Sequence, residues 1–310
     1  MFCAGAAALT FPSRSNQAYL YVADRSFDRQ ADRIAIYDKS ARGNVPPRRT
    51  IAGGKTELDY AQGIAVDDGR NVYVSSFARV TVYAPGASGD AKPIREIAGT
   101  ATGLDVTGGV AVDPDANVYV VNGTARFRPE VAIFGAGANG NVSPGRRILG
   151  PKTQLGAPVG IAVDQAGNVY VTNTTYPPSI TVYSTGASGD VKPALQIAGP
   201  DTQLDAPTGI AVDASGDIYV ADYPSKSVLV YAAGAGGNVA PIRTIAGPET
   251  TLTYPWGIAL DVRNRMYVTN VAATKSISVF AAGADGNAAP IRRISGPRTK
   301  LYDPLGIAVR

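Results

Sequence analysis

The chain has 310 residues, of which 45% are hydrophobic and 17% are charged, and its formal net charge is +4. So small a charge over this length argues against a nucleic-acid partner, and the absence of histidine excludes Ser-His-Asp, Cys-His and histidine-metal chemistry. No run of 18 apolar residues occurs, so no membrane-spanning helix is predicted.

Residues 1–18 are predicted to form a tail outside the folded domain. The segment 1–9 is small and apolar, lacks a basic start and is too short for a full signal peptide. Two interpretations stay open. The segment is the remnant of an export leader, with Cys3 at the start of a mature lipoprotein, or it is an ordinary disordered tail. The first, which we favour, predicts a bacterial protein in an extracellular or periplasmic location.

From residue 19 onward the sequence repeats one pattern, whose clearest copy spans 160–200 and contains four short apolar runs separated by turn residues. The N-terminal copy lacks the first run, and the C-terminal copy, 306–309, consists of nothing else. The two ends therefore complete one unit, which predicts a closed ring. The glycine that opens the first run recurs at positions 63, 109, 160, 209, 257 and 306, with spacings of 46, 51, 49, 48 and 49 residues.

We expect each unit to form four β-strands, A to D in chain order. The runs are rich in Val, Ile, Tyr and Thr, which is typical of strands. Runs A and B are almost continuously apolar, as in 161–163 and 169–171, so both faces of each sheet are covered. Radial repetition of such units predicts an all-β, six-bladed β-propeller over residues 19–310, with strand 306–309 closing the ring beside 19–23.

Turn and edge residues fit this arrangement. The A–B link is a tight hairpin, in which Gly167, Gly216 and Asn264 supply the residue that adopts a positive φ. Strand D, at the outer edge, is rich in arginine. We interpret these arginines as charges that prevent edge-to-edge pairing, with anion binding as the alternative. They are Arg48, Arg49, Arg95, Arg146, Arg147, Arg243, Arg292 and Arg293.

The phrase Pro-x-Gly-Ile-Ala-Val-Asp, followed by Gly-Asn-Val-Tyr-Val, resembles the NHL repeat of six-bladed propellers, and the resemblance covers residues 19–310. It implies the fold but leaves the activity open, because that family includes nucleic-acid binders, protein-interaction platforms, lyases and lactonases.

The residue before each opening glycine is expected to line the channel mouth, on the face shared by the D–A and B–C connections. These residues are Gln62, Gly108, Val159, Thr208, Trp256 and Leu305. All six differ in an otherwise uniform repeat, which indicates a binding site, although unselected drift would give the same pattern. Lactonases of the gluconolactonase type hold a divalent metal near this register with Glu, Asn and Asp. Because the register here has no carboxylate, we predict no metal, no cofactor and no catalytic residue.

A polar residue ends strand B in every unit. We expect each to cap its own B–C loop through local backbone bonds. The six are Asp24, Ser76, Asn122, Asn173, Asp222 and Asn270.

Aromatic and arginine side chains gather on the predicted loop face, a composition typical of binding surfaces, although ordinary exposed loops are the alternative. We therefore predict a monomeric, non-enzymatic binding or scaffolding propeller for a protein, glycan or anionic ligand. A lactonase- or lyase-like enzyme with an atypical site and a nucleic-acid-binding propeller remain alternatives. The predicted contact residues are Gln62, Phe77, Arg79, Arg126, Arg128, Tyr176, Thr208, Tyr223, Tyr254 and Trp256.

Overall fold

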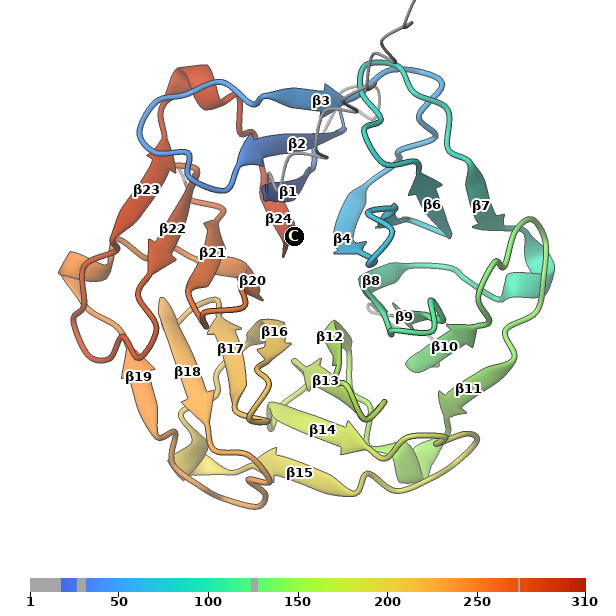
Figure 1. The fold of residues 1–310 in the computed structure, drawn as a ribbon. Coiled ribbons are helices and arrows are strands. Elements are labelled where there is room, and N and C mark those ends of the chain that lie inside the picture. The colour runs from blue at the N-terminus through green and yellow to red at the C-terminus, as the bar shows by residue number, and fades with distance from the viewer. Residues whose placement is uncertain (1–17, 27–31, 124–127, 273) are drawn as a thin grey trace, which may run out of the picture.

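The computed structural model describes residues 18–26, 32–123, 128–272 and 274–310. These residues form six antiparallel four-stranded sheets, arranged as blades around a central axis (Figure 1). The prediction of a six-bladed propeller is confirmed. The predicted tail, apart from residue 18, and the predicted contact residue Arg126 lie outside the described residues.

Strands A to D of each blade run in order from the channel outward. Blade one comprises β24 (Pro304–Val309), β1 (Tyr19–Asp24), β2 (Arg33–Asp38) and β3 (Arg49–Ile51). Blade two comprises β4 (Ala61–Val66), β5 (Val72–Ser76), β6 (Arg79–Tyr83) and β7 (Arg95–Ala98). Blade three comprises β8 (Thr107–Val112), β9 (Val118–Asn122), β10 (Glu130–Phe134) and β11 (Arg146–Leu149).

Blade four comprises β12 (Pro158–Val163), β13 (Val169–Asn173), β14 (Ser179–Tyr183) and β15 (Leu195–Ala198). Blade five comprises β16 (Pro207–Val212), β17 (Ile218–Asp222), β18 (Ser227–Tyr231) and β19 (Arg243–Ile245). Blade six comprises β20 (Pro255–Leu260), β21 (Met266–Asn270), β22 (Ser276–Phe280) and β23 (Arg292–Ser295). Short 3-10 helices follow strand D: η1 (Thr100–Thr102), η2 (Pro151–Thr153), η3 (Pro200–Thr202), η4 (Pro248–Thr250) and η5 (Pro297–Thr299).

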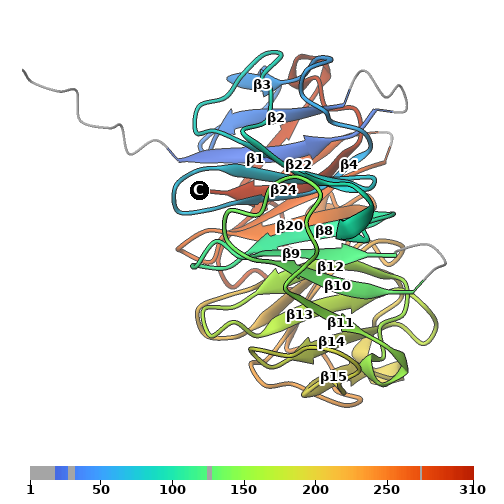
Figure 2. The same ribbon diagram turned by 90° about the vertical axis from the view of Figure 1, so that its right-hand side faces the viewer.

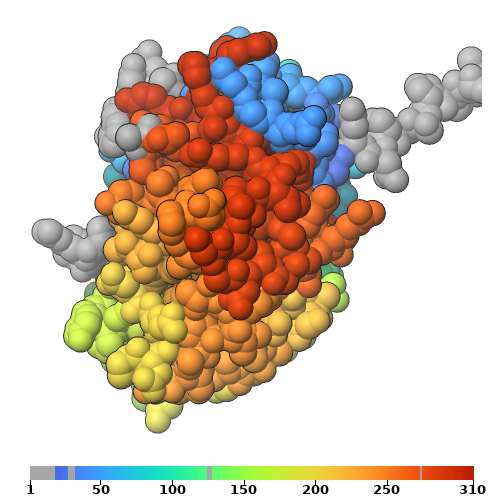
Figure 3. Space-filling view, turned by 90° about the vertical axis from the view of Figure 1, so that its left-hand side faces the viewer, coloured from blue at the N-terminus to red at the C-terminus, as the bar shows by residue number. Residues whose placement is uncertain are grey.

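The C-terminal strand closes the ring as predicted. Strand β24 pairs antiparallel with β1, with Val309 opposite Leu20 and Ala308 opposite Tyr21. In the space-filling view the blue surface of blade one lies directly against the red surface of blade six (Figure 3). The hydrophobic core is divided among the blade interfaces: at this seam, Tyr37 of blade one and Tyr267 of blade six belong to one buried cluster.

Strand A contains glycine because neighbouring blades approach one another closely at the axis. A Cβ added to Gly160 would lie 2.1 Å from the carbonyl oxygen of Thr208 in the next blade. No side chain fits there without moving one backbone away from the other. The five corresponding glycines face the next blade's backbone in the same way: Gly63, Gly109, Gly209, Gly257 and Gly306.

The outer rim is fastened by a second contact between blades. The Oδ1 of Asn238, in the C–D turn of blade five, accepts a hydrogen bond of 2.8 Å from the backbone N–H of Asp201, which lies in η3 after blade four. This bond satisfies an N–H at the start of the short helix. The corresponding residues in the other blades are Asn44, Asp90, Asn141, Asp190 and Asn287.

Several outer-strand arginines reach inward. Arg243 Nη2 donates to the Tyr219 hydroxyl at 3.0 Å, and that hydroxyl donates to Asp213 of the A–B hairpin at 3.2 Å. Arg95, Arg146 and Arg292 contact the strand B tyrosines of their own blades in the same way. These four arginines are therefore part of the internal hydrogen bonding of their blades.

Candidate functional site

The B–C and D–A loops lie together on one side of the ring, which we call the loop face. Their backbones are hydrogen-bonded: Tyr223 N–H donates to the Ala206 carbonyl at 3.2 Å, and Val271 N–H donates to the Tyr254 carbonyl at 3.2 Å. Seen edge-on, the ring is about one strand deep, and the C-terminus lies on the opposite side (Figure 2). Because strand A begins at the loop face, its first residues surround the mouth of the channel.

Five of the six polar residues that end strand B fasten the D–A loop, so for these five the prediction that they cap the B–C loop was wrong. The sixth, Ser76, has a buried hydroxyl without a hydrogen-bond partner among the described residues. Asn173 Oδ1 accepts from the backbone N–H of Gly156 at 2.9 Å, and Asp24, Asn122, Asp222 and Asn270 accept from equivalent loops. The reason is geometric: strand B ends beside the loop that enters its antiparallel partner A, so the nearest free N–H groups belong to that loop. Burial raises the pKa of Asp24 and of Asp222, although these hydrogen bonds oppose the shift.

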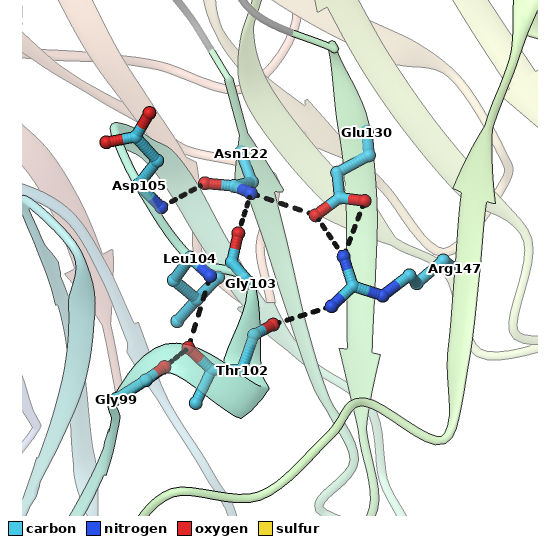
Figure 4. Close-up of polar contacts among 8 residues, drawn as sticks. All are labelled: Gly99, Thr102, Gly103, Leu104, Asp105, Asn122, Glu130 and Arg147. Atoms are coloured by element: carbon cyan, nitrogen blue, oxygen red, sulfur yellow. Dashed lines mark hydrogen bonds and ion pairs between the residues drawn. The ribbon is translucent and has the colours of Figure 1, made fainter.

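Blade three elaborates this arrangement into a buried network (Figure 4). Asn122 donates to Glu130 at 2.8 Å, and Arg147 donates to both carboxylate oxygens of Glu130 at 2.7 and 2.8 Å. Arg147 also donates to the Thr102 carbonyl at 2.8 Å. Since Glu130 is only 4% exposed, this pairing is what makes its charge tolerable. The network holds the strand that leads away from Arg128, a predicted contact residue.

The six residues that precede the opening glycines alternate around the mouth. In blades two, four and six they are partly exposed and the glycine is buried. In blades three, five and one they are buried and the glycine is partly exposed. Strand A bulges at this point in all six blades, so the alternation reflects two forms of one bulge.

The backbone and strand B follow the same alternation. Three residues before the glycine, Tyr60, Ala157 and Tyr254 have positive φ values of 63°, 43° and 57° in the even-numbered blades. No described residue at this position has a positive φ in the odd-numbered blades. The penultimate residue of strand B carries a hydroxyl in the even-numbered blades, at Ser75, Thr172 and Thr269, whereas the odd-numbered blades have Ala23, Val121 and Ala221.

Of the six predicted mouth residues, only Gln62, Val159 and Trp256 line the channel and are also partly exposed. Thr208 is 3% exposed, and its hydroxyl donates to the Trp256 carbonyl at 2.9 Å, so it belongs to the scaffold beneath the mouth. The channel itself has a volume of about 360 Å³ and is lined by strand A of all six blades.

A second hollow of about 360 Å³ opens on the loop face over blades five, six and one, and we call it the aromatic pocket. Trp256 meets Tyr223 edge to face, with ring centroids 5.7 Å apart. Tyr223 in turn lies against Tyr254, with centroids 4.9 Å apart. Such arrangements are favourable for aromatic rings and hold them in place. The pocket is lined by Arg25, Tyr223, Trp256, Val271, Lys275, Tyr302, Asp303 and Leu305.

Cationic groups surround these rings. Lys226 Nζ lies 5.3 Å from the ring centre of Tyr254, and Lys275 Nζ lies 5.8 Å from that of Tyr302. Both distances are typical of cation–π contacts. Arg25 forms an ion pair of 2.7 Å with Asp303, which balances the charge of the one carboxylate among the described lining residues. No salt bridge involves either lysine within the described part of the chain.

Of the predicted contact residues, the structure brings together Tyr223, Tyr254 and Trp256. Tyr176, 91% exposed, lies on blade four, and Phe77 on blade two, both away from the aromatic pocket. Arg79 is held in ion pairs with Glu57 at 3.0 Å and Glu96 at 2.9 Å.

Sequence reasoning missed Lys275 and Asp303 as members of the site. A signal for the lysine existed, because the residue before strand C is lysine only in blades five and six. In the other blades that residue is Asp32, Ala78, Pro129 or Pro178.

Among the described residues, no three His, Cys, Asp or Glu side chains gather as a possible metal site. No helix in the same residues is long and apolar enough to cross a membrane.

Comparison with known proteins agrees with the fold. A family model for the NHL repeat matches residues 204–231, from the loop before β16 to the end of β18. A structure of a nidogen/laminin complex is similar, with a TM-score of 0.67 and 16% identity over 94% of this chain and 98% of that one. A protein of unknown function from Bacteroides caccae gives a TM-score of 0.66 and 11% identity over the same shares. A search of curated proteins found no match.

The repeat and the ring together define the class: the chain is a six-bladed β-propeller, and its segment 204–231 matches the NHL repeat that the sequence resembles.

Proposed function

We propose that this propeller is a non-enzymatic binding protein and that it engages its ligand at the aromatic pocket of the loop face. The observation that carries the proposal is the contact of Trp256 with Tyr223 beside lysines that have no acidic partner among the described residues. Binding surfaces concentrate their energy in such aromatic and cationic side chains.

The scaffold supports this role because it holds the aromatic residues in place before a ligand arrives. Trp256 lies on strand A, and its backbone carbonyl accepts a hydrogen bond from the buried hydroxyl of Thr208. Tyr223 directly follows β17, and its N–H is bonded to the D–A loop. Little conformational entropy is then lost on binding, which favours affinity.

The test compares two loop-face variants, Trp256→Ala and Tyr176→Ala, on peptide and glycan arrays. Both remove one aromatic side chain from the loop face, but only Trp256 lines the aromatic pocket. We expect wild-type binding to persist in a chelator, to be lost in Trp256→Ala and to be unchanged in Tyr176→Ala. Equal effects of the two variants would refute the proposal.

Metal content and thermal melting with and without chelator address the enzymatic alternative. Stoichiometric calcium or zinc, together with a melting temperature that falls in chelator and hydrolysis of lactones, would replace the binding role by an enzyme. A steep dependence of binding on salt would instead indicate nucleic acid.

A further inference from the structure

The shape of the aromatic pocket suits one flat ring. Trp256 and Tyr223 form an aromatic wall, and Val271 and Leu305 add apolar surface to the lining. The volume of about 360 Å³ lies near the lower end of the range for small-molecule sites. The aromatic residues therefore favour a small ligand with an apolar, planar body.

The polar groups of the lining are mostly donors. Lys275, Arg25 and the indole N–H of Trp256 can donate hydrogen bonds but cannot accept them. Among the described lining residues the one carboxylate is Asp303, whose Oδ2 receives two bonds from Arg25, at 3.0 and 2.7 Å. A neutral sugar could use these groups but would leave the charge of Lys275 without an anionic partner. A ligand with anionic oxygens is well matched.

The charges of the lining indicate how negative the ligand is. Among the described lining residues the charges of Arg25 and Asp303 cancel, which leaves one positive charge, that of Lys275. Lys226 lies further out, over Tyr254. One uncompensated ammonium matches one carboxylate better than it matches the doubly charged group of a phosphate monoester.

We propose that the aromatic pocket binds an aromatic monocarboxylate, with its ring against Trp256 and its carboxylate toward Lys275. This inference rests on the proposed binding function and narrows it to a ligand class. The bond from Lys275 is charge-assisted, which makes it stronger than a bond between neutral groups.

The single tryptophan of the chain makes the test direct, because its fluorescence reports on this pocket and on the channel mouth beside it and on no other part of the molecule. The probe is phenylacetate, titrated with excitation of the indole. The comparison ligands are phenylacetamide, which lacks the charge, phenyl phosphate, which carries a second charge, and D-glucuronate, which carries the carboxylate on a sugar. We expect saturable binding of phenylacetate and affinities at least about tenfold weaker for the other three.

Lys275→Gln is expected to weaken phenylacetate binding about tenfold, whereas the matched variant Lys192→Gln, in an exposed C–D turn of blade four, leaves it unchanged. Trp256→Ala has no tryptophan fluorescence, so its binding of phenylacetate is measured by calorimetry instead. We expect this variant to lose binding. Tighter binding of glucuronate or of phenyl phosphate, or equal binding of the amide, would overturn the proposed ligand class.

The two proposals fail in different ways. If phenylacetate does not bind but an array ligand still depends on Trp256, the ligand class is wrong and the binding role stands. If neither phenylacetate nor any array ligand depends on Trp256, both proposals are refuted.

Discussion

Thr172 of blade four donates a hydrogen bond from its hydroxyl to the backbone carbonyl of Thr208 in blade five, at 2.7 Å. The same hydroxyl accepts from the N–H of Gly160 in its own blade, at 2.8 Å. One buried side chain thus satisfies backbone groups of two blades. Ser75 and Thr269 make the corresponding bonds in blades two and six, and the alanine or valine of the other blades cannot.

Thr172→Val should lower the free energy of unfolding by about 1–3 kcal/mol. The change keeps the shape but leaves a buried N–H and a buried carbonyl without their partner, and unsatisfied groups are costly. Urea unfolding measures the effect. Thr185→Val, at an exposed position, should change stability by less than about 0.5 kcal/mol. A Thr172→Val protein as stable as the control would show that the hydroxyl is not needed.

Gly160→Ala should be among the most damaging substitutions in the chain. Its methyl group would sit 2.1 Å from the Thr208 carbonyl oxygen, so two blades would have to separate at the axis. We expect a loss of about 3 kcal/mol or more, or failure to fold. Gly135→Ala is the matched control, because nothing lies within 4 Å of its added Cβ. Thermal melting of the two variants measures the difference in stability. Similar melting temperatures would contradict the close approach of Gly160 to the backbone of the next blade.

Asn238→Ala should release the outer fastening between blades four and five. The N–H of Asp201 loses its acceptor, as in the removal of a helix cap, which costs about 0.5–2 kcal/mol. Hydrogen exchange should accelerate at Asp201 and its neighbours in η3 more than in the strands near the axis. The control is Gln165→Ala, an exposed hairpin residue. Uniform acceleration throughout the molecule would argue against a local role.

Asp261 and Asp222 should give opposite pH profiles when each is replaced by Asn. Burial opposes ionisation of Asp261, but bonds from Arg265, the Arg263 backbone and Lys39 outweigh it and lower its pKa. A lowered pKa adds stability that is present above the unfolded value of about 4 and is lost as pH falls. Asp261→Asn should therefore cost about 1–3 kcal/mol at pH 7 and progressively less below pH ~4.

For Asp222 the pKa shift has the opposite direction, so the pH dependence of stability is also opposite. Burial raises its pKa despite bonds from the Asp205 backbone and Ser225, so the folded protein binds the proton more tightly than the unfolded chain does. The ionised carboxylate then disfavours folding at neutral pH. Stability of Asp222→Asn relative to wild type should rise as pH increases above about 4. Denaturant unfolding at several pH values measures both profiles, and parallel curves for the two variants would contradict the assigned shifts.

The repeat made the ring predictable, because each unit contains the same strand signals and the incomplete ends supply each other's missing strands. The role of Asn173 was less accessible, because the loop that it caps lies beside it only after strands A and B have paired. Thr208 shows a similar limit. Its register suggested the channel mouth, but the form of its bulge depends on the hydroxyl of Thr172 in the preceding blade.

The aromatic pocket was predictable in part. The rings of Tyr223, Tyr254 and Trp256 were identifiable as unusual residues of the loop face. Lys275 joins them only when blade six has folded, and Asp303 only when β24 has entered blade one beside β1. The suggested export from the cytoplasm stays a prediction.

The alternating hydroxyls have a consequence for how many blades the ring can hold. Blades with and without the hydroxyl can alternate around a closed ring only when the number of blades is even. Removal or duplication of a single blade would place two like blades side by side and leave one backbone carbonyl without the hydroxyl of the preceding blade, or one hydroxyl without its carbonyl. The natural unit of growth for this propeller is therefore the pair of blades.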